Sequence, residues 1–116
     1  MIRILKCEIA MTPPSVNHYW VANGKKRFLS ARAKQFIQVV KLLVKPKRSV
    51  KRLKLDATLH FPDKRVRDID NHLKAILDAL VKSGLCVDDE QFDEIVVKRG
   101  NIVKGGLVEL EVWEME

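Results

Sequence analysis

Apolar and polar residues alternate along four segments of the chain, as they do in half-buried strands. Over residues 2–10 the alternation places Leu5, Cys7 and Ile9 on one apolar side. Residues 53–61 alternate more regularly, with an apolar residue at every odd position. Residues 95–100 and 107–114 read as two further strands, and the turn with Gly105-Gly106 between them is typical of a hairpin. The pattern therefore predicts four strands.

Two other segments place apolar residues at helical spacing. The first follows Ser30, a favourable N-cap residue, and stops before Pro46. The second runs from about Asp70 to Ser83 and is followed by Gly84, a residue type that commonly ends helices. The apolar residues are Ala33, Phe36, Ile37, Val40, Leu43 and Val44 in the first helix, and Leu73, Ile76, Leu77 and Leu80 in the second. The apolar side of the first helix fits either a core or a dimer seam.

The remaining segments read as loops. Residues 11–27 contain Pro13-Pro14 and Gly24, so an ordered loop is expected there, and residues 45–54 read as a basic linker. The resulting order is β-α-β-α-β-β. It predicts an α+β fold, with a single small domain over residues 1–116 whose mixed sheet packs against two helices.

Composition excludes several classes of protein. With 116 residues, 47% of them hydrophobic and 32% charged, the chain has the composition of one globular domain. No apolar run approaches the roughly 20 residues that span a bilayer, and the N-terminal residues alternate with charge, unlike a signal peptide. Cys7 and Cys86 form neither a Cys-x-x-Cys pair nor a disulfide framework. We therefore expect a cytoplasmic protein with reduced thiols and no membrane partner.

Charge is segregated along the chain. The net charge is +7, but residues 1–54 hold 14 Lys and Arg and one acid, whereas residues 55–116 hold 8 Lys and Arg and 14 acids. Cations clustered in this way favour nucleic acid as a partner over a solvated surface that serves solubility alone. The candidate DNA-binding residues are Lys25, Lys26 and Arg27 at a turn, and Lys64, Arg65 and Arg67 in a charged loop.

The acids of the second half include two pairs, one on each side of the second helix. Asp68 and Asp70 precede the helix, and Asp88 and Asp89 follow it. Residues two apart share a side in an extended stretch, so Asp68 and Asp70 converge if the helix starts at about Asp70. Carboxylates gathered in a basic protein suit Mg²⁺, which prefers oxygen ligands. Lys74, one turn after Asp70, would hold a phosphate or neutralise charge developing on it.

The same acids have simpler explanations. Asp68 or Asp70 would serve as an N-cap, and Asp88-Asp89 as a turn. Asp70 and Lys74 would form an ion pair one turn apart, in a stripe that continues to Asp78. The helix also separates its two ends by roughly 20 Å. The second acidic pair therefore meets the first only if the loop folds back or the next strand passes the helix start.

The chain resembles the RusA family of Holliday-junction resolvases, small endonucleases of bacteria and their prophages. The matching segments are PPSVNHYW (13–20), the glycine and cations at 24–27, RDIDNHLKAILDALVKSGLCVDDEQ (67–91) and KGGLVEL (104–110). The pattern D-x-D-N-x-x-K-x-x-x-D-A-L-x-x-x-G-x-x-x-D-D-x-Q is long and specific. The resemblance implies a metal-dependent homodimer that resolves four-way junction DNA by paired symmetric nicks, in recombination and repair.

The resemblance also implies roles for individual residues. By motif match, Asp68, Asp70 and Asp89 would be the essential catalytic and metal-binding carboxylates, and Asp88 would lie beside them as a further metal ligand. Lys74 would be the functional lysine. The cofactor would be Mg²⁺, with Mn²⁺ as a substitute.

As an alternative, the chain would be a non-catalytic module that binds branched DNA, or a decayed prophage resolvase. Such a module uses the same cations but gains nothing from carboxylates, which repel phosphate. Tyr19 and Trp20 fit core packing better than stacking on unpaired bases. His72 is expected at the surface.

Overall fold

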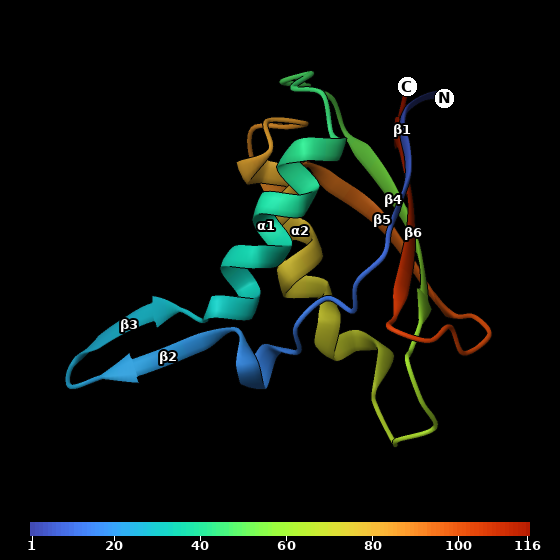
Figure 1. Cartoon of the computed structure of the whole chain (residues 1–116). Coiled ribbons are helices and arrows are strands. Elements are labelled where there is room, and N and C mark those ends of the chain that lie inside the picture. The colour runs from blue at the N-terminus through green and yellow to red at the C-terminus, as the bar shows by residue number, and fades with distance from the viewer.

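A mixed four-stranded sheet organises the fold in the computed structural model, which describes all residues from 1 to 116 (Figure 1). Its strands are β1 (Ile2–Ile9), β4 (Leu53–His60), β5 (Phe92–Arg99) and β6 (Leu107–Glu114), in the spatial order β1-β6-β4-β5. β6 runs antiparallel to both of its neighbours, whereas β4 and β5 are parallel. The predicted mixed sheet and α+β class are confirmed.

Two helices, α1 (Ala31–Leu43) and α2 (Leu73–Lys82), cover one face of the sheet (Figure 1). The alternation in β4 explains this arrangement, because its odd-numbered residues are buried and its even-numbered residues lie partly exposed on the other face. The buried apolar residues of sheet and helices form one core cluster. Phe36, Ile37 and Val40 belong to that core, whereas Leu43 is 48% exposed. Neither helix is both long and apolar enough to cross a membrane.

Capping groups set the predicted helix ends. Ser30 Oγ accepts the backbone N–H of Ala33 at 3.1 Å, and α1 begins there. At the end of α2, the N–H groups of Gly84 and Leu85 donate to the carbonyls of the last helical turn, and Gly84 has a φ of 83°. This Schellman pattern needs a residue in the left-handed region, which glycine adopts without strain.

The predicted hairpin of the last two strands is wrong. β5 and β6 do not pair, because β4 lies between them and β5 is an edge strand. The connecting residues 100–106 cross the end of β4. They are held there by the N–H of Gly100 on the Leu59 carbonyl (2.9 Å) and the N–H of Val103 on the Phe61 carbonyl (3.0 Å). β5 also begins earlier than predicted, directly after a 3₁₀ turn, η3 (Asp89–Gln91).

The segment predicted as an ordered loop contains a second, two-stranded sheet. β2 (Trp20–Asn23) and β3 (Lys26–Leu29) form an antiparallel hairpin whose turn includes Gly24, with a φ of 65°. A short 3₁₀ turn, η1 (Val16–His18), precedes it. Most side chains of the hairpin are exposed, so no apolar alternation marks its strands in the sequence. The hairpin projects from the body of the molecule (Figure 1).

His72 is buried, so the prediction that it lies at the surface is wrong. It ends a 3₁₀ turn, η2 (Ile69–His72), that leads into α2. The residue is 4% exposed, its Nδ1 lies 2.7 Å from the carbonyl oxygen of Pro13, and its ring packs against Phe61. This contact joins the proline loop to the start of α2. Tyr19 is fully buried, as core packing predicts.

Candidate functional site

Asp68 and Asp70 lie where the chain has left β4 and turns through η2 into α2. Asp68 occupies the N-cap position of η2, but its side chain accepts no capping hydrogen bond. Both residues are exposed, and the nearby cations Arg67 and Lys74 are bound to other acids. Neither carboxylate belongs to any hydrogen bond or ion pair of the structure. The capping explanation therefore fails for Asp68, and both carboxylates are available to a ligand.

Asp88 has a structural role. Its Oδ1 accepts the backbone N–H of Glu90 at 3.0 Å, and Gln91 Oε1 accepts the backbone N–H of Asp88 at 2.9 Å. These two bonds form a capping box around η3. The turn explanation therefore holds for Asp88, while Asp89 follows it as the first residue of η3, with an exposed side chain.

Lys74 pairs with Asp78 and not with Asp70. Its Nζ lies 3.2 Å from Asp78 Oδ1, one turn further along α2. Asp70 precedes the regular helix, in η2, so the spacing that the sequence suggested for an ion pair does not apply to it. The other oxygen of Asp78 accepts the hydroxyl of Tyr19 at 2.8 Å. Lys74 therefore belongs to a three-residue network.

The carboxyl groups of Asp88 and Asp89 shift each other's pKa. The pKa of Asp88 is lowered, chiefly because its carboxylate accepts the N–H of Glu90. The pKa of Asp89 is raised, first by the neighbouring carboxyl group of Asp88, then by burial and by the charge of Asp78, while Lys74 opposes the shift. Asp89 thus lies within electrostatic reach of Lys74 and Asp78. The loop after α2 therefore folds back, and η3 contacts the helix.

The structure does not gather the four predicted carboxylates into one cluster. Along the chain, the ten residues of α2 separate Asp68 and Asp70 from Asp88 and Asp89, but the folded-back loop brings Asp89 within electrostatic reach of Lys74, the second residue of that helix. No group of three or more His, Cys, Asp or Glu side chains is arranged to hold one metal ion. The acids form two pairs in the sequence, and Lys74 and its partner Asp78 lie on the helix that connects them along the chain.

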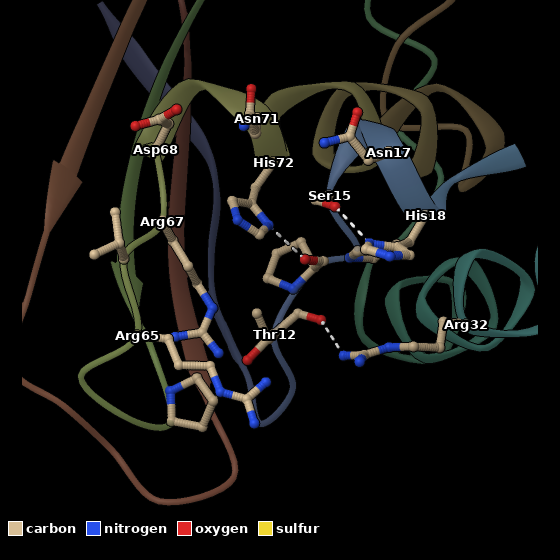
Figure 2. A pocket seen from close by; sticks show the side chains of 14 residues that line it. Thr12, Ser15, Asn17, His18, Arg32, Arg65, Arg67, Asp68, Asn71 and His72 are labelled. Atoms are coloured by element: carbon tan, nitrogen blue, oxygen red, sulfur yellow. Dashed lines mark hydrogen bonds between the residues drawn. The ribbon is translucent and has the colours of Figure 1, made fainter.

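A cavity of about 480 Å³ opens beside Asp68 of the first acidic pair (Figure 2). The proline loop, the start of α1 and the charged loop after β4 form its walls. Its charged lining residues are Arg32, Arg65, Arg67 and Asp68. Figure 2 shows Arg32 on one side of the cavity and Arg65 and Arg67 on the other. Arg67 is oriented by a 2.6 Å ion pair to Asp63, and Lys64 of the same loop is exposed. Three guanidinium groups around one cavity suit a phosphate.

The hairpin carries the other candidate cations. Lys25 and Lys26 are exposed and belong to none of the ion pairs in the structure. The Arg27 guanidinium lies over the Trp20 ring, 4.6 Å from its centroid. In the basic linker, by contrast, Arg52 is bound by two acids near η3. The hairpin therefore offers two unpaired ammonium groups to an anionic partner.

The roles of Arg32 and Tyr19 were not predicted from the sequence. Arg32 reaches the cavity only because the start of α1 packs beside the proline loop, and nothing near it in the sequence marks it. Tyr19 reaches Asp78 across 59 positions of the chain. Asp78 did carry a signal, since it continues the helical stripe of Asp70 and Lys74.

Comparison with known proteins agrees with the motif. The family model described as Endodeoxyribonuclease RusA matches residues 10–112. A relative from Enterobacteria phage HK97, named Crossover junction endodeoxyribonuclease rusA, is 36% identical over 108 residues, which cover 90% of each chain. Relatives with the corresponding name from Enterobacteria phage 82 and from Escherichia coli strain K12 are each 35% identical over 107 residues, or 89% of each chain. The match includes the hairpin, the cavity and both acidic pairs, and the chain belongs to the RusA family of endodeoxyribonucleases.

Proposed function

We propose that this chain is a metal-dependent endodeoxyribonuclease that resolves four-way DNA junctions in recombination and repair. Family membership over residues 10–112, with relatives named crossover junction endodeoxyribonuclease, carries the proposal. The chain, residues 1–116, would form one RusA-like endonuclease domain. It would act as a homodimer, because a four-way junction offers a two-fold target and paired symmetric nicks then follow from protein symmetry.

The chemistry of the acidic side chains suits a hard divalent cation. Mg²⁺ takes oxygen ligands, and one or two carboxylates beside water and phosphate are sufficient. Asp68 and Asp70 offer two exposed carboxylates without protein partners, which meets that number. Asp88 and Asp89, which this structure does not gather with them around one ion, are proposed as further ligands. When bound, such a cation supplies Lewis acidity toward phosphate and water. Mn²⁺ shares this ligand preference and would substitute for Mg²⁺.

The cationic side chains would bind and orient the DNA. Lys74, exposed in the first turn of α2 and within electrostatic reach of Asp89, would contact the scissile phosphate or neutralise charge developing on it. Arg65 and Arg67 at the cavity, with Lys64 beside them, would bind backbone phosphates near the acids. Lys25, Lys26 and Arg27 on the projecting hairpin would extend the contact along the DNA. These cations offset the repulsion between the carboxylates and phosphate.

Cleavage of a labelled synthetic four-way junction in Mg²⁺ or Mn²⁺ tests the proposal. We expect nicks that EDTA abolishes and that Asp70→Asn abolishes while junction binding is retained. Asp56→Asn is the matched control, because it removes a carboxylate from the sheet face that carries no helix. The non-catalytic alternative predicts tight junction binding without nicks in either metal. Normal cleavage by Asp70→Asn would refute the role assigned to that carboxylate.

A further inference from the structure

Both carboxylate oxygens of Asp78 accept a hydrogen bond. Oδ2 accepts the hydroxyl of Tyr19 at 2.8 Å, and Oδ1 accepts the ammonium of Lys74 at 3.2 Å. Exposure rises along this chain of contacts. Tyr19 is fully buried, the side chain of Asp78 is 20% exposed, and that of Lys74 is 46% exposed. The contacts therefore run from the core of the protein to its surface.

Tyr19 is a rigid end to this chain of contacts. Its ring packs edge-on against Trp20 with centroids 5.3 Å apart, and its backbone carbonyl accepts the N–H of Ser30 at 2.9 Å. Burial, together with the bond to Asp78, raises the pKa of Tyr19, so its hydroxyl remains a proton donor at every working pH. A buried hydroxyl needs a partner, and Asp78 is the one that Tyr19 has.

The Tyr19 contact makes the pair of Lys74 and Asp78 different from an ordinary surface ion pair. A lysine side chain has four flexible carbons, and an exposed pair one helical turn apart holds it weakly. Here the acid cannot rotate away without leaving a buried hydroxyl unpaired. Asp89 lies within electrostatic reach of both members of this ion pair. The lysine is therefore held within reach of a residue of the second acidic pair.

We infer that Asp78 is a positioning residue that holds the Lys74 ammonium for its action on the scissile phosphate, and that Tyr19 fixes Asp78 in turn. The inference rests on the proposed function, because it assigns Lys74 to the cleavage reaction. The inference assigns Asp78 no contact of its own with the substrate. With both oxygens accepting hydrogen bonds from the protein, it acts through Lys74.

A double-mutant cycle under single-turnover conditions tests this inference. The four proteins are the wild type, Asp78→Asn, Lys74→Met and the double variant, and the measured quantity is the rate constant for junction cleavage in Mg²⁺. Asp78→Asn keeps the shape and an acceptor for Tyr19 but presents an amide to Lys74. We expect it to slow cleavage by about tenfold or more, as for other residues that orient a reactive group. In the Lys74→Met background, we expect Asp78→Asn to change the cleavage rate constant by less than about twofold.

Two further variants separate positioning from folding. Tyr19→Phe should slow cleavage by a smaller factor than Asp78→Asn, and only where Lys74 is present. Asp56→Asn breaks a 3.2 Å ion pair to Lys98 on the helix-free face of the sheet and should leave the rate within about twofold. Junction affinity in EDTA should be unchanged by Asp78→Asn, since the proposed loss is in the reaction and not in binding.

The possible outcomes are distinct. Equal slowing by Asp78→Asn in both backgrounds would indicate a structural role and overturn the inference, as would a normal rate for Asp78→Asn beside a slow Lys74→Met. If Lys74→Met cleaves like the wild type, the role of Lys74 in the proposed function is wrong, and the inference fails with it.

Discussion

Removing the two lysines at the hairpin turn should change the salt dependence of junction binding by a defined amount. Lys25 and Lys26 are exposed and unpaired, so each is free to replace a counterion at a phosphate. Each phosphate contact contributes about 0.9 to the slope of log K against log salt, so Lys25→Ala/Lys26→Ala should reduce that slope by about 1.8. At about 0.1 M salt this slope change corresponds to roughly 60-fold weaker binding, if counterion release is the whole effect.

Fluorescence anisotropy of a labelled four-way junction in EDTA, titrated at several salt concentrations, measures both quantities. The matched control is Lys54→Ala/Lys98→Ala, which removes the same charge from the helix-free face of the sheet. There each lysine lies 3.2 Å from an acid, so neither is free for phosphate, and the slope should stay close to that of the wild type. An unchanged slope for the hairpin variant would refute the contact. Equal reductions of the slope in both double variants would show that junction binding depends on net charge and not on the position of the lysines.

Three further predictions concern stability. Ser30→Ala removes the cap of α1 and should lower the free energy of unfolding by about 1 kcal/mol in urea denaturation, and an unchanged midpoint would argue against the cap. Gly100→Ala places a Cβ against the His60 imidazole, which is held by Glu109 and the Asn101 carbonyl. Displacing that ring loses two hydrogen bonds, which lowers the free energy of unfolding by about 2 kcal/mol. Tm should therefore fall by several degrees, and a wild-type Tm would contradict this packing. The hydrogen bonds to Glu109 and to the Asn101 carbonyl raise the pKa of His60, so its protonated form stabilises the fold below the unfolded pKa of about 6.5. That contribution is lost as the pH rises through the folded-state pKa, so His60→Gln should lower Tm more at about pH 5.5 than at about pH 8.5, and equal lowering would contradict the pair.

Local chemistry made the helices and most of the main-sheet strands predictable. The Ser30 cap and the glycine after α2 act within a few residues of themselves, and the alternation in β4 directly reflects one buried face. The pairing of β5 was not predictable in this way. β5 pairs with β4, which is distant from it in the sequence, and not with β6, the next strand along the chain. The hairpin of β2 and β3 was not predicted for a different reason. Most of its side chains are exposed, so its sequence shows no apolar alternation.

The candidate site was likewise predictable only in part: its motif residues were predicted from the sequence, but their spatial arrangement was not. Asp68, Asp70, Asp88, Asp89 and Lys74 belong to one sequence motif, so the sequence alone singled them out. Their spatial relations depend on how the loop after α2 folds back, which the pattern left open. The bond between Tyr19 and Asp78, and the burial of His72 under the proline loop, each join segments 59 positions apart. Only the tertiary structure brings these groups together.

The most direct test of the proposed junction cleavage is to map the nicks in a four-way junction whose strands are labelled one at a time. In Mg²⁺ we predict two nicks, at symmetry-related positions in two strands of like polarity. A linear duplex of the same sequence should remain intact, and EDTA should abolish the cleavage. Equal cutting of the linear duplex, or scattered nicks in all four strands, would indicate a general nuclease and contradict the proposed function. Tight junction binding without any nick in Mg²⁺ or Mn²⁺ would contradict the catalytic role of the acidic pairs.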